Sequence, residues 1–452
     1  MGQDDQALRT TPALAPARPT CVRYLVLAVA CSLAVLTYVQ RQGFIAATPY
    51  LKEHFHLDDN QMGFFFIAVW LVAYGLFQVP GGLIGDRIGS RHLLTLLVVG
   101  WSLTLGAVAL TVFLPVGGWL PLAVLLGLRF LFGSFQAGVF PGLARVVADW
   151  MPAQRRGFAQ GSIWTCSRLG GAVAPLLVVW LITWVFRGGW APPLALLAAF
   201  GLVWSTLFWL WFRNRPQEMR TVNAAEVELI SSDRPAAPER TGPVPWLALL
   251  RSPSVWGLCL MYGFVGFAGN FVTNFLNIYL RDHRKLDDNT TALLAGLPLA
   301  AGVVSCLLGG VVSDWLIRRL GSRKWGRRLV GLVALALAGL ASLLTPWVQE
   351  AWLLALSISA WMFFNDATMG PAWASCADVG ERYAGTLSGA MNMIGAFLGA
   401  AGMLLAGQLL DRHAYEIMFV IFACSYVLAA LCWLAVDVTK PLVPPGEQGG
   451  PG

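Results

Sequence analysis

The sequence predicts an all-α integral membrane protein with twelve transmembrane helices in two pseudo-symmetric six-helix bundles. Three observations lead to this fold class. The 452-residue chain is 57% hydrophobic and 12% charged, whereas soluble proteins carry about 25% charged residues. Twelve apolar stretches are long enough to cross a bilayer as helices. A motif that follows the second stretch returns after the eighth, which indicates a duplicated six-span unit.

The apolar stretches, in chain order, are the predicted spans. Each approaches or exceeds the ~20 residues that cross ~30 Å of hydrocarbon as a helix. The short alternating segments typical of a membrane barrel are not seen. The predicted spans are residues 22–48, 61–85, 93–114, 119–147, 158–186, 191–212, 254–280, 291–313, 329–347, 351–376, 384–408 and 415–436.

The distribution of Lys and Arg along the chain indicates how the protein is oriented in the membrane. A net charge of +7 could indicate an acidic partner such as nucleic acid. In this topology, however, 22 of the 31 Lys and Arg residues lie on the side that holds the termini, six lie on the other side and three lie within spans. This is the positive-inside pattern, so both termini are expected to be cytoplasmic. We therefore expect a multi-pass protein of the inner or plasma membrane, with the lipid bilayer and no nucleic acid as partner.

The chain divides into a cytoplasmic tail, a first bundle, a linker, a second bundle and a second cytoplasmic tail. The linker is the longest polar stretch and is rich in Pro, Arg and Glu. The repeated motifs are GGLIGDRIGSR (81–91) and GGVVSDWLIRRLGSR (309–323), and they place Asp86 and Asp314 228 residues apart. The predicted boundaries are 1–21, 22–213, 214–253, 254–437 and 438–452.

Two of these stretches resemble signatures of the major facilitator superfamily. Residues 81–91 resemble its loop 2–3 signature, G-x-L-x-D-R-x-G-R-R/K, and RFLFGSFQA (129–137) resembles its span 4 motif, R-x-x-x-G-x-x-x-A. Within the superfamily, the chain is similar to the anion:cation symporter branch, which includes sugar-acid, hexuronate and vesicular-glutamate-type carriers. That similarity covers nearly the whole chain. It rests on Arg41 followed by Pro49, and on the stretches 133–157, 215–230 and 388–395.

Charged residues inside the predicted spans are mostly cationic. Arg41, Arg129 and Arg168 lie in spans 1, 4 and 5, whereas Asp366 in span 10 is the one acid placed deep within a span. Buried charges are costly unless paired, and an anionic substrate would supply the missing partner. Arginine presents a rigid donor fork that suits carboxylate or phosphate. The excess of buried cations therefore predicts a small organic anion as the substrate.

Each buried arginine also has a structural interpretation. Arg41 could snorkel from a helix end to the headgroups, but the resemblance implies that it is the main anion anchor. Arg129 belongs to the span 4 motif, and the resemblance implies a structural role beside the cavity. Arg168 lies too deep for easy snorkelling, so we expect it to face the cavity. The alternative for Arg168 is an ion pair with Asp366 from the other half, which could also act as a gate.

Polar side chains could shape the binding region further. Tyr38 is one turn before Arg41 and faces the same way, and Asn270 and Asn274 share a face of span 7 with Tyr262. The resemblance implies that residues near Tyr38, Tyr74, Asn392 and the span 7 face bond to substrate hydroxyls or carboxylate. Helix packing is an equally good explanation for any one of them. The predicted binding residues are Arg41, Arg168, Tyr38, Tyr74, Gln136, Asn270, Asn274 and Asn392.

The chain departs from its family at the expected proton sites. Proton-coupled members usually have Asp just before the span 1 arginine and commonly Glu in span 4, where this chain has Gln40 and Gln136. Glutamine cannot titrate, so three coupling modes stay open. Asp366 could carry a proton, the carrier could be an exchanger or facilitator, or sodium could couple through other ligands. Our working hypothesis is that Asp366 couples.

The repeated motif predicts a gate at the cytoplasmic side. Asp86 ends span 2 and can approach the positive N-terminal end of span 11, which would hold that side closed. The resemblance implies this role, with Arg87 and Arg91 as loop partners, and Asp314 with Arg323 would do the same for the other half. The alternative is that these residues form only a solvated, positive-inside loop.

These observations predict a secondary transporter that moves a sugar acid, hexuronate or related carboxylate by alternating access. The first alternative is an exporter of amphipathic compounds or drugs on the same fold, and the second is a non-transporting membrane sensor. An enzyme is not expected, because the five histidines map to loops or span ends and no catalytic set is seen. The eight cysteines are scattered through apolar runs, so neither a metal nor a cofactor is expected. We expect a monomer.

Overall fold

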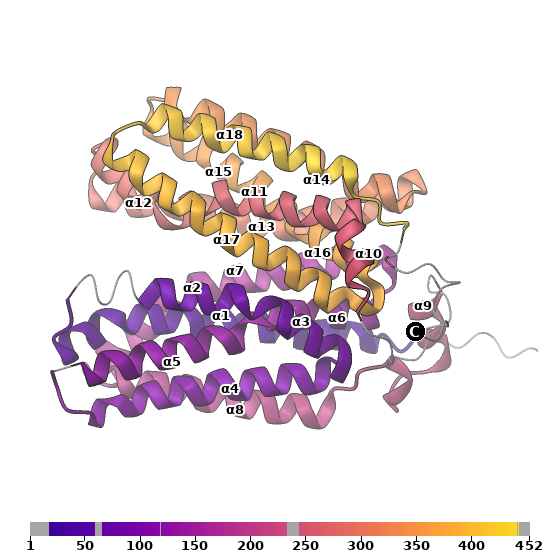
Figure 1. Cartoon of the computed structure of the whole chain (residues 1–452), viewed down its shortest axis with the longest axis horizontal. Coiled ribbons are helices and arrows are strands. Elements are labelled where there is room, and N and C mark those ends of the chain that lie inside the picture. The colour runs from indigo at the N-terminus through magenta and orange to yellow at the C-terminus, as the bar shows by residue number, and fades with distance from the viewer. Residues whose placement is uncertain (1–17, 59–65, 118, 233–243, 441, 443–452) are drawn as a thin grey trace, which may run out of the picture.

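The computed structural model describes residues 18–58, 66–117, 119–232, 244–440 and 442. These residues form an all-helical protein in which two bundles of helices lie side by side (Figure 1). The first bundle contains α1 (Val22–Phe55), α2 (Phe66–Leu76), α3 (Gln78–Ile88), α4 (Ser90–Leu110), α5 (Leu120–Ala137), α6 (Val139–Trp150), α7 (Arg156–Trp180) and α8 (Ala191–Trp211). Two short helices follow it, α9 (Ala224–Ser231) and α10 (Trp246–Arg251).

The second bundle repeats the arrangement of the first. It contains α11 (Pro253–Asn274), α12 (Leu276–Ile278), α13 (Asp288–Leu320), α14 (Arg323–Leu344), α15 (Ala351–Ala367), α16 (Met369–Gly380), α17 (Ala384–Asp411) and α18 (Tyr415–Cys432). We call the face on which α1 begins and α18 ends the termini face.

The described helices account for the twelve predicted spans. Eleven continuous segments are long and apolar enough to cross a membrane, and one of them runs for 61 residues from Ala351 to Asp411. A single crossing needs only ~20 residues. A 3-10 turn over Glu381–Tyr383 separates α16 from α17 within that segment, so it contains spans 10 and 11. The predicted fold class is confirmed, whereas the exact boundaries of the two halves and the linker stay predictions.

Spans 2, 4 and 10 are each broken after one helix and resumed in the next. The breaks fall at Phe77, Gly138 and Thr368, and a proline follows each break three residues later, at positions 80, 141 and 371. Proline has no N–H and its ring crowds the carbonyl four residues before it. That carbonyl belongs to the last residue of the helix before each break. The proline positions therefore explain the breaks.

Glycines let the two bundles approach each other closely. Spans 2, 4 and 5 of the first bundle pack against spans 8, 10 and 11 of the second. A Cβ atom added at Gly82 of α3 would lie 2.5 Å from the carbonyl carbon of Gly385 in α17. One added at Gly310 of α13 would lie 2.7 Å from the carbonyl carbon of Gly157 in α7. Backbone therefore meets backbone at two equivalent places near the termini face.

The short helix α9 is tied to the start of the first bundle by one acidic side chain. The carboxylate of Glu226 is fully buried and accepts hydrogen bonds from the backbone N–H groups of Val22 and Arg23, each at 3.0 Å. It also accepts from the Arg23 guanidinium at 3.0 Å and from the Thr20 hydroxyl. Free N–H groups at a helix start favour a negative partner, so Glu226 caps α1 from a distant part of the chain.

We predict that Glu226→Ala lowers the free energy of unfolding by about 2 kcal/mol, because the cap of α1 is lost. Burial raises the pKa of this carboxyl, but the bonds from Arg23, Thr20 and Val22 outweigh burial and leave the pKa below its ordinary value. The stabilisation is thus present at neutral pH and is lost as pH falls through the lowered pKa. Chemical unfolding in detergent measures the change. The control is Glu228→Ala, which alters an exposed side chain of the same helix; an equal loss in both variants would contradict the prediction.

Candidate functional site

Arg41 lies in the middle of α1 and is surrounded by aromatic rings. Its guanidinium carbon is 4.9 Å from the ring centre of Tyr38, 4.8 Å from that of Trp70 and 4.8 Å from that of Tyr74. The residue is only 8% exposed. Cation–π contacts of this kind stabilise a guanidinium without neutralising its charge. The rings therefore hold a buried positive charge in place.

A glutamine amide fixes the orientation of this guanidinium. The Nε of Arg41 donates to Oε1 of Gln136 at 3.0 Å, and the amide of Gln136 donates to the backbone carbonyl of Thr37 at 3.2 Å. The Nη2 atom of Arg41 is buried and has no hydrogen-bond partner. Within the part of the chain that the structure describes, no acidic side chain forms an ion pair with Arg41. The site thus presents a preorganised and uncompensated cation.

A second cation joins the two bundles. Nη2 of Arg168 in α7 lies 2.8 Å from Oδ1 of Asp366 in α15, and the Asp366 side chain is fully buried. The alternative ion pair considered for Arg168 is therefore present. Nε of Arg168 and Oδ2 of Asp366 are both buried without a hydrogen-bond partner. The Arg168 nitrogen could donate to a ligand, and the Asp366 oxygen could bind a proton.

A chain of hydrogen bonds positions Asp366 from the second bundle. The amide of Asn365 donates to Oδ1 of Asp366 at 2.9 Å, and its carbonyl oxygen accepts from the Tyr426 hydroxyl at 2.8 Å. The Trp361 indole donates to that hydroxyl at 2.6 Å. All four side chains are buried. The carboxylate therefore sits on a rigid support.

Two tyrosines connect the arginines to each other and to the second bundle. The Tyr38 ring covers the Arg41 guanidinium and packs against Gly171 of α7, three residues after Arg168. The Tyr74 hydroxyl accepts a hydrogen bond from Asn392 in α17 at 3.3 Å. The structure thus gathers most of the predicted binding set into one region, which we call the central cluster. Its members are Arg41, Arg168, Tyr38, Tyr74, Gln136, Asn392 and Asp366.

Asn270 and Asn274 bond and pack with neighbours outside the central cluster. Asn274 is exposed and donates to the backbone carbonyl of Asn270 and the hydroxyl of Thr273. The Asn270 side chain packs against Gly399 of α17. No hydrogen bond or ring contact between described residues joins either of them to the central cluster, so a substrate-binding role for them stays a prediction.

Arg129 lies next to the central cluster, behind the aromatic rings. Its guanidinium carbon is 4.7 Å from the ring centre of Phe44 and 5.6 Å from that of Trp70, the ring that also covers Arg41. The residue is 1% exposed. This placement fits the structural role that the family resemblance implies.

An aromatic layer separates the central cluster from the termini face. Phe140 stacks on Trp164 with ring centres 4.6 Å apart, and Trp164 meets Trp373 of the second bundle at 5.4 Å. The Trp373 indole donates to the Tyr262 hydroxyl at 3.3 Å. Phe140 and Trp70 were not among the predicted residues. Among 20 tryptophans and 25 phenylalanines, nothing in the sequence sets these two apart from rings that anchor the protein at the membrane interface.

Gln40 faces away from the central cluster. Its amide donates to the backbone carbonyl of Leu197 in α8 at 2.6 Å, and its oxygen accepts from the Trp101 indole in α4. The side chain is fully buried. At this position, an uncharged amide ties span 1 to spans 3 and 6.

The two repeated aspartates make equivalent contacts across the bundles at the termini face. Asp86 accepts hydrogen bonds from the backbone N–H groups of Gly385 (3.0 Å) and Thr386 (2.7 Å), at the start of α17. Asp314 accepts from the N–H groups of Gly157 (3.1 Å) and Phe158 (2.7 Å), at the start of α7. Each carboxylate thus meets the positive end of a helix in the opposite bundle.

The cations beside these aspartates differ from the expected ones. Arg91 was expected beside Asp86, but its guanidinium donates to the Trp209 carbonyl at 2.6 and 2.9 Å. Among the described residues, the cation that pairs with Asp86 is Arg145, at 3.9 Å, while Arg87 is exposed. The start of α14 turns Arg327 rather than Arg323 toward Asp314. The sequence does not distinguish one arginine near a span end from another. Which of them faces the aspartate depends on the rotation of the helix about its axis.

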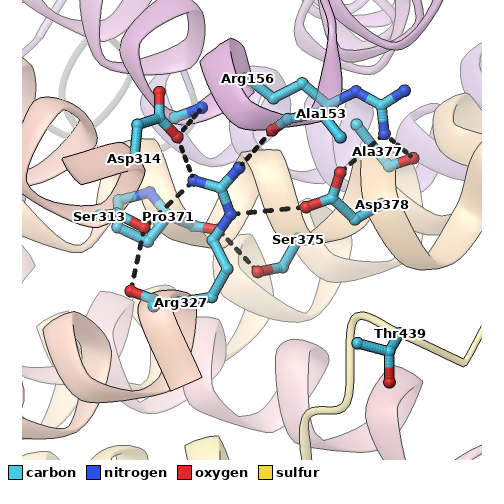
Figure 2. A network of polar contacts seen from close by, with 12 residues as sticks. Ala153, Arg156, Ser313, Asp314, Arg327, Pro371, Ser375, Ala377, Asp378 and Thr439 are labelled. Atoms are coloured by element: carbon cyan, nitrogen blue, oxygen red, sulfur yellow. Dashed lines mark hydrogen bonds and ion pairs between the residues drawn. The ribbon is translucent and has the colours of Figure 1, made fainter. Parts of the chain in front are cut away.

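Figure 2 shows the polar network around Arg327. Its guanidinium lies 2.8 Å from Asp314 and 3.4 Å from Asp378, and it donates to the carbonyl of Ala153 at 3.2 Å. Asp378 also pairs with Arg156 of the first bundle at 2.7 Å. Arg327, Asp378 and Arg156 were not predicted, because each looks like an ordinary charge near a span end. Together they form a buried ionic network between the bundles.

Comparison with known proteins identifies the family. Residues 30–403 match the sequence model of the Major Facilitator Superfamily. The chain belongs to the Major Facilitator Superfamily. As a member, it is a multi-pass membrane transporter and not an enzyme, as expected from the sequence.

Named relatives cover almost the whole of this superfamily member. It is 31% identical to the probable sulfoacetate transporter SauU of Cupriavidus necator, over 95% of this chain and 97% of the relative. It is 26% identical to the probable galactarate/D-glucarate transporter GarP of Escherichia coli K12, over 92% and 94%. The solved proton:xylose symporter XylE superposes with a TM-score of 0.72 at 16% identity, over 92% of this chain and 96% of that one. That likeness shows the shared fold.

Proposed function

We propose that this transporter carries a small organic anion, either a sugar acid, a hexuronate or a related carboxylate or sulfonate. The observation that carries the proposal is the buried guanidinium of Arg41, which has an unpartnered Nη2 and no acid of the described residues paired with it. An anionic group would compensate this charge. The relatives named for sulfoacetate and for galactarate/D-glucarate support the same class of substrate.

The geometry suggests how the anion is held. A carboxylate or sulfonate accepts hydrogen bonds from the Arg41 guanidinium, which the three rings and Gln136 already orient. Because the guanidinium is fixed before the substrate arrives, binding costs little ordering entropy. Hydroxyl groups of a sugar acid could bond to Tyr38, Tyr74 and Asn392. The Asn392–Tyr74 bond crosses the bundles, so a substrate placed there would contact both halves.

Alternating access would follow from breaking and remaking the contacts between the halves. In the structure, Asp86, Asp314 and the network around Arg327 hold the bundles together at the termini face. The aromatic layer lies between that face and the central cluster. We propose that this state is closed to the cytoplasm. Rocking of one half against the other would then expose the substrate to that side.

We further propose that a proton couples through Asp366, because Gln40 and Gln136 cannot titrate. Oδ2 of Asp366 is unpartnered and available for a proton. Asp366→Asn is expected to remove accumulation driven by an inward proton gradient and to leave downhill flux in place. Uptake into proteoliposomes with and without the gradient measures this difference. Full gradient-driven accumulation by the variant would refute coupling through Asp366.

The substrate class is tested by uptake of purified protein in proteoliposomes. The panel contains hexonates, hexuronates, small carboxylates, sulfoacetate and neutral sugars. We expect uptake of acids and none of neutral sugars. A panel without acid uptake, in vesicles that work with a known carrier, would overturn the proposal. Efflux stimulated by amphipathic drugs would then favour the exporter, and specific binding without flux would favour the sensor.

We also propose a cell-membrane location with both termini in the cytoplasm, and a monomeric transport unit. The asymmetric distribution of Lys and Arg supports the orientation. The central cluster supports the monomer, because the two bundles complete it together, with Arg168 and Tyr74 from the first and Asp366 and Asn392 from the second.

A further inference from the structure

We propose that the central cluster favours organic diacids, with one acidic group on Arg41 and the other on Arg168, and that Asp366 takes up one proton when a diacid displaces it from Arg168. This inference rests on the proposed function, because it names the substrate class of the same site. It differs from simple proton symport, since the proton is bound with a diacid and not with a monoacid.

The first support is that the two arginines are separate cationic centres. Arg41 is held by Gln136 and three rings, whereas Arg168 is held by Asp366. Each guanidinium keeps a buried nitrogen without a hydrogen-bond partner, Nη2 in Arg41 and Nε in Arg168. Two orphan donors of this kind are what two anionic groups of one ligand would satisfy. Tyr38 covers the Arg41 guanidinium, and its ring packs against Gly171, one turn after Arg168 on α7, so both centres border one region.

The second support is the charge balance of the cluster. While Asp366 is ionised, it neutralises Arg168, and only the charge of Arg41 is left for a ligand. A monoacid then completes the balance without disturbing the ion pair. A diacid brings a second negative charge, which has no partner unless Arg168 leaves Asp366. The displaced carboxylate would be buried without a cation, and such a group takes up a proton instead of staying charged.

The surroundings of Asp366 allow this exchange. Arg168 from α7 is the charged side chain that faces it among the described residues. The other neighbours are uncharged: Asn365 on its own helix, Tyr426 behind Asn365 on α18, and the Cys306 thiol on α13. Tyr38 of α1 also lies nearby. Hydrogen bonding to Asn365 keeps the carboxyl group in place after Arg168 leaves.

The step balances in protons and charge. The protein with ionised Asp366, a dianion and one proton from water give a complex in which Asp366 is neutral. The two acidic groups of the ligand face Arg41 and Arg168. No bond other than the new O–H bond at Asp366 is formed, and the proton returns to water when the diacid leaves.

The test compares glucarate with gluconate, two six-carbon acids that differ in one terminal carboxylate. Titration calorimetry of the purified protein in buffers of different ionisation enthalpy counts the protons bound with each ligand. We expect one proton per glucarate and none per gluconate. The Kd for glucarate should rise about tenfold per pH unit where Asp366 is ionised in the free protein, and the Kd for gluconate should stay constant. An equal proton count for the two acids would overturn the inference.

Two variants locate the effect. Asp366→Asn should bind glucarate without proton uptake and without pH dependence. Arg168→Gln should weaken glucarate at least tenfold more than gluconate. Arg281→Gln, which removes an exposed charge outside the cluster, is the matched control and should leave the ratio of the two Kd values as it was. An equal loss for both acids in Arg168→Gln would refute the second anion position. If wild-type protein binds neither these two acids nor any other acid of the uptake panel, the proposed function itself fails, whereas binding of panel acids with no preference for glucarate over gluconate refutes this inference alone.

Discussion

Replacing Arg41 with alanine is expected to abolish uptake of the anion. The guanidinium is buried and fixed by Gln136 and three rings, and it is not paired with an acid in the part of the chain that the structure describes. Removing one partner of a buried, hydrogen-bonded charge pair costs about 2–5 kcal/mol, which corresponds to a loss of affinity of about 30- to 4,000-fold. Arg41→Lys keeps the charge but loses the planar donor fork. We therefore expect its uptake rate to lie between that of Arg41→Ala and that of the wild type. Initial rates of uptake into proteoliposomes measure both variants.

The control for Arg41 is Arg281→Ala, which removes an arginine that is exposed and lies outside the central cluster. Its uptake rate should equal that of wild type. Matched amounts of folded, reconstituted protein separate loss of function from loss of folding. Normal anion uptake by Arg41→Ala would show that the buried cation serves packing and that the anion binds elsewhere.

The second large effect is expected at Gly82. An added Cβ would lie 2.5 Å from the carbonyl carbon of Gly385, which is closer than side-chain carbons come to backbone, and neither backbone can move aside cheaply. Overpacking of this kind costs about 1–3 kcal/mol, or about 5- to 150-fold in a conformational equilibrium. Gly82→Ala should therefore favour states in which the bundles separate at the termini face, and the uptake rate should fall at least fivefold.

Hydrogen exchange at two backbone amides measures directly whether the bundles are in contact at the termini face. The N–H groups of Gly385 and Thr386 are bonded to Asp86 in the structure, so Gly82→Ala should speed their exchange with solvent. Gly310→Ala should do the same at Gly157 and Phe158, where the equivalent contact lies. Gly127→Ala is the control, because an added Cβ there meets nothing within 4 Å. Unchanged exchange and uptake in Gly82→Ala would mean that this close approach is not part of the transport cycle.

Much of the fold could be predicted because bilayer-crossing helices are set by length and apolarity alone. The repeat correctly identified Asp86 and Asp314 as equivalent positions, and each carboxylate meets the first turn of a helix in the other bundle. The sequence could not decide between a cavity role and an ion pair for Arg168. That choice depends on whether α7 and α15 meet, and a contact between residues 198 positions apart leaves no local pattern.

Rotation of a helix was the main source of misplaced partners. Arg91 and Arg323 were expected beside the aspartates. Instead, Arg327, one turn after Arg323 in α14, contacts Asp314. Arg91 donates to a backbone carbonyl at the end of α8. Spacing along span 7 placed Asn270 and Asn274 on one face, yet it could not show that Asn274 is exposed. The buried pair of Arg156 and Asp378 looked like two unrelated charges near the membrane surface. Such pairs become visible only when both bundles are assembled.

The pairing of Arg168 with Asp366 has a consequence for the response to membrane voltage. A monoacid that crosses on Arg41 alone carries one negative charge, and a diacid that crosses with one proton on Asp366 also carries one. Both cargoes would therefore be electrically equivalent, and an inside-negative potential would oppose their entry by about 2.3 kcal/mol per 100 mV, a factor of roughly 50 in concentration. Without further coupling ions, a carrier built in this way would work most easily as an exchanger of one anion for another, because such a cycle moves no net charge.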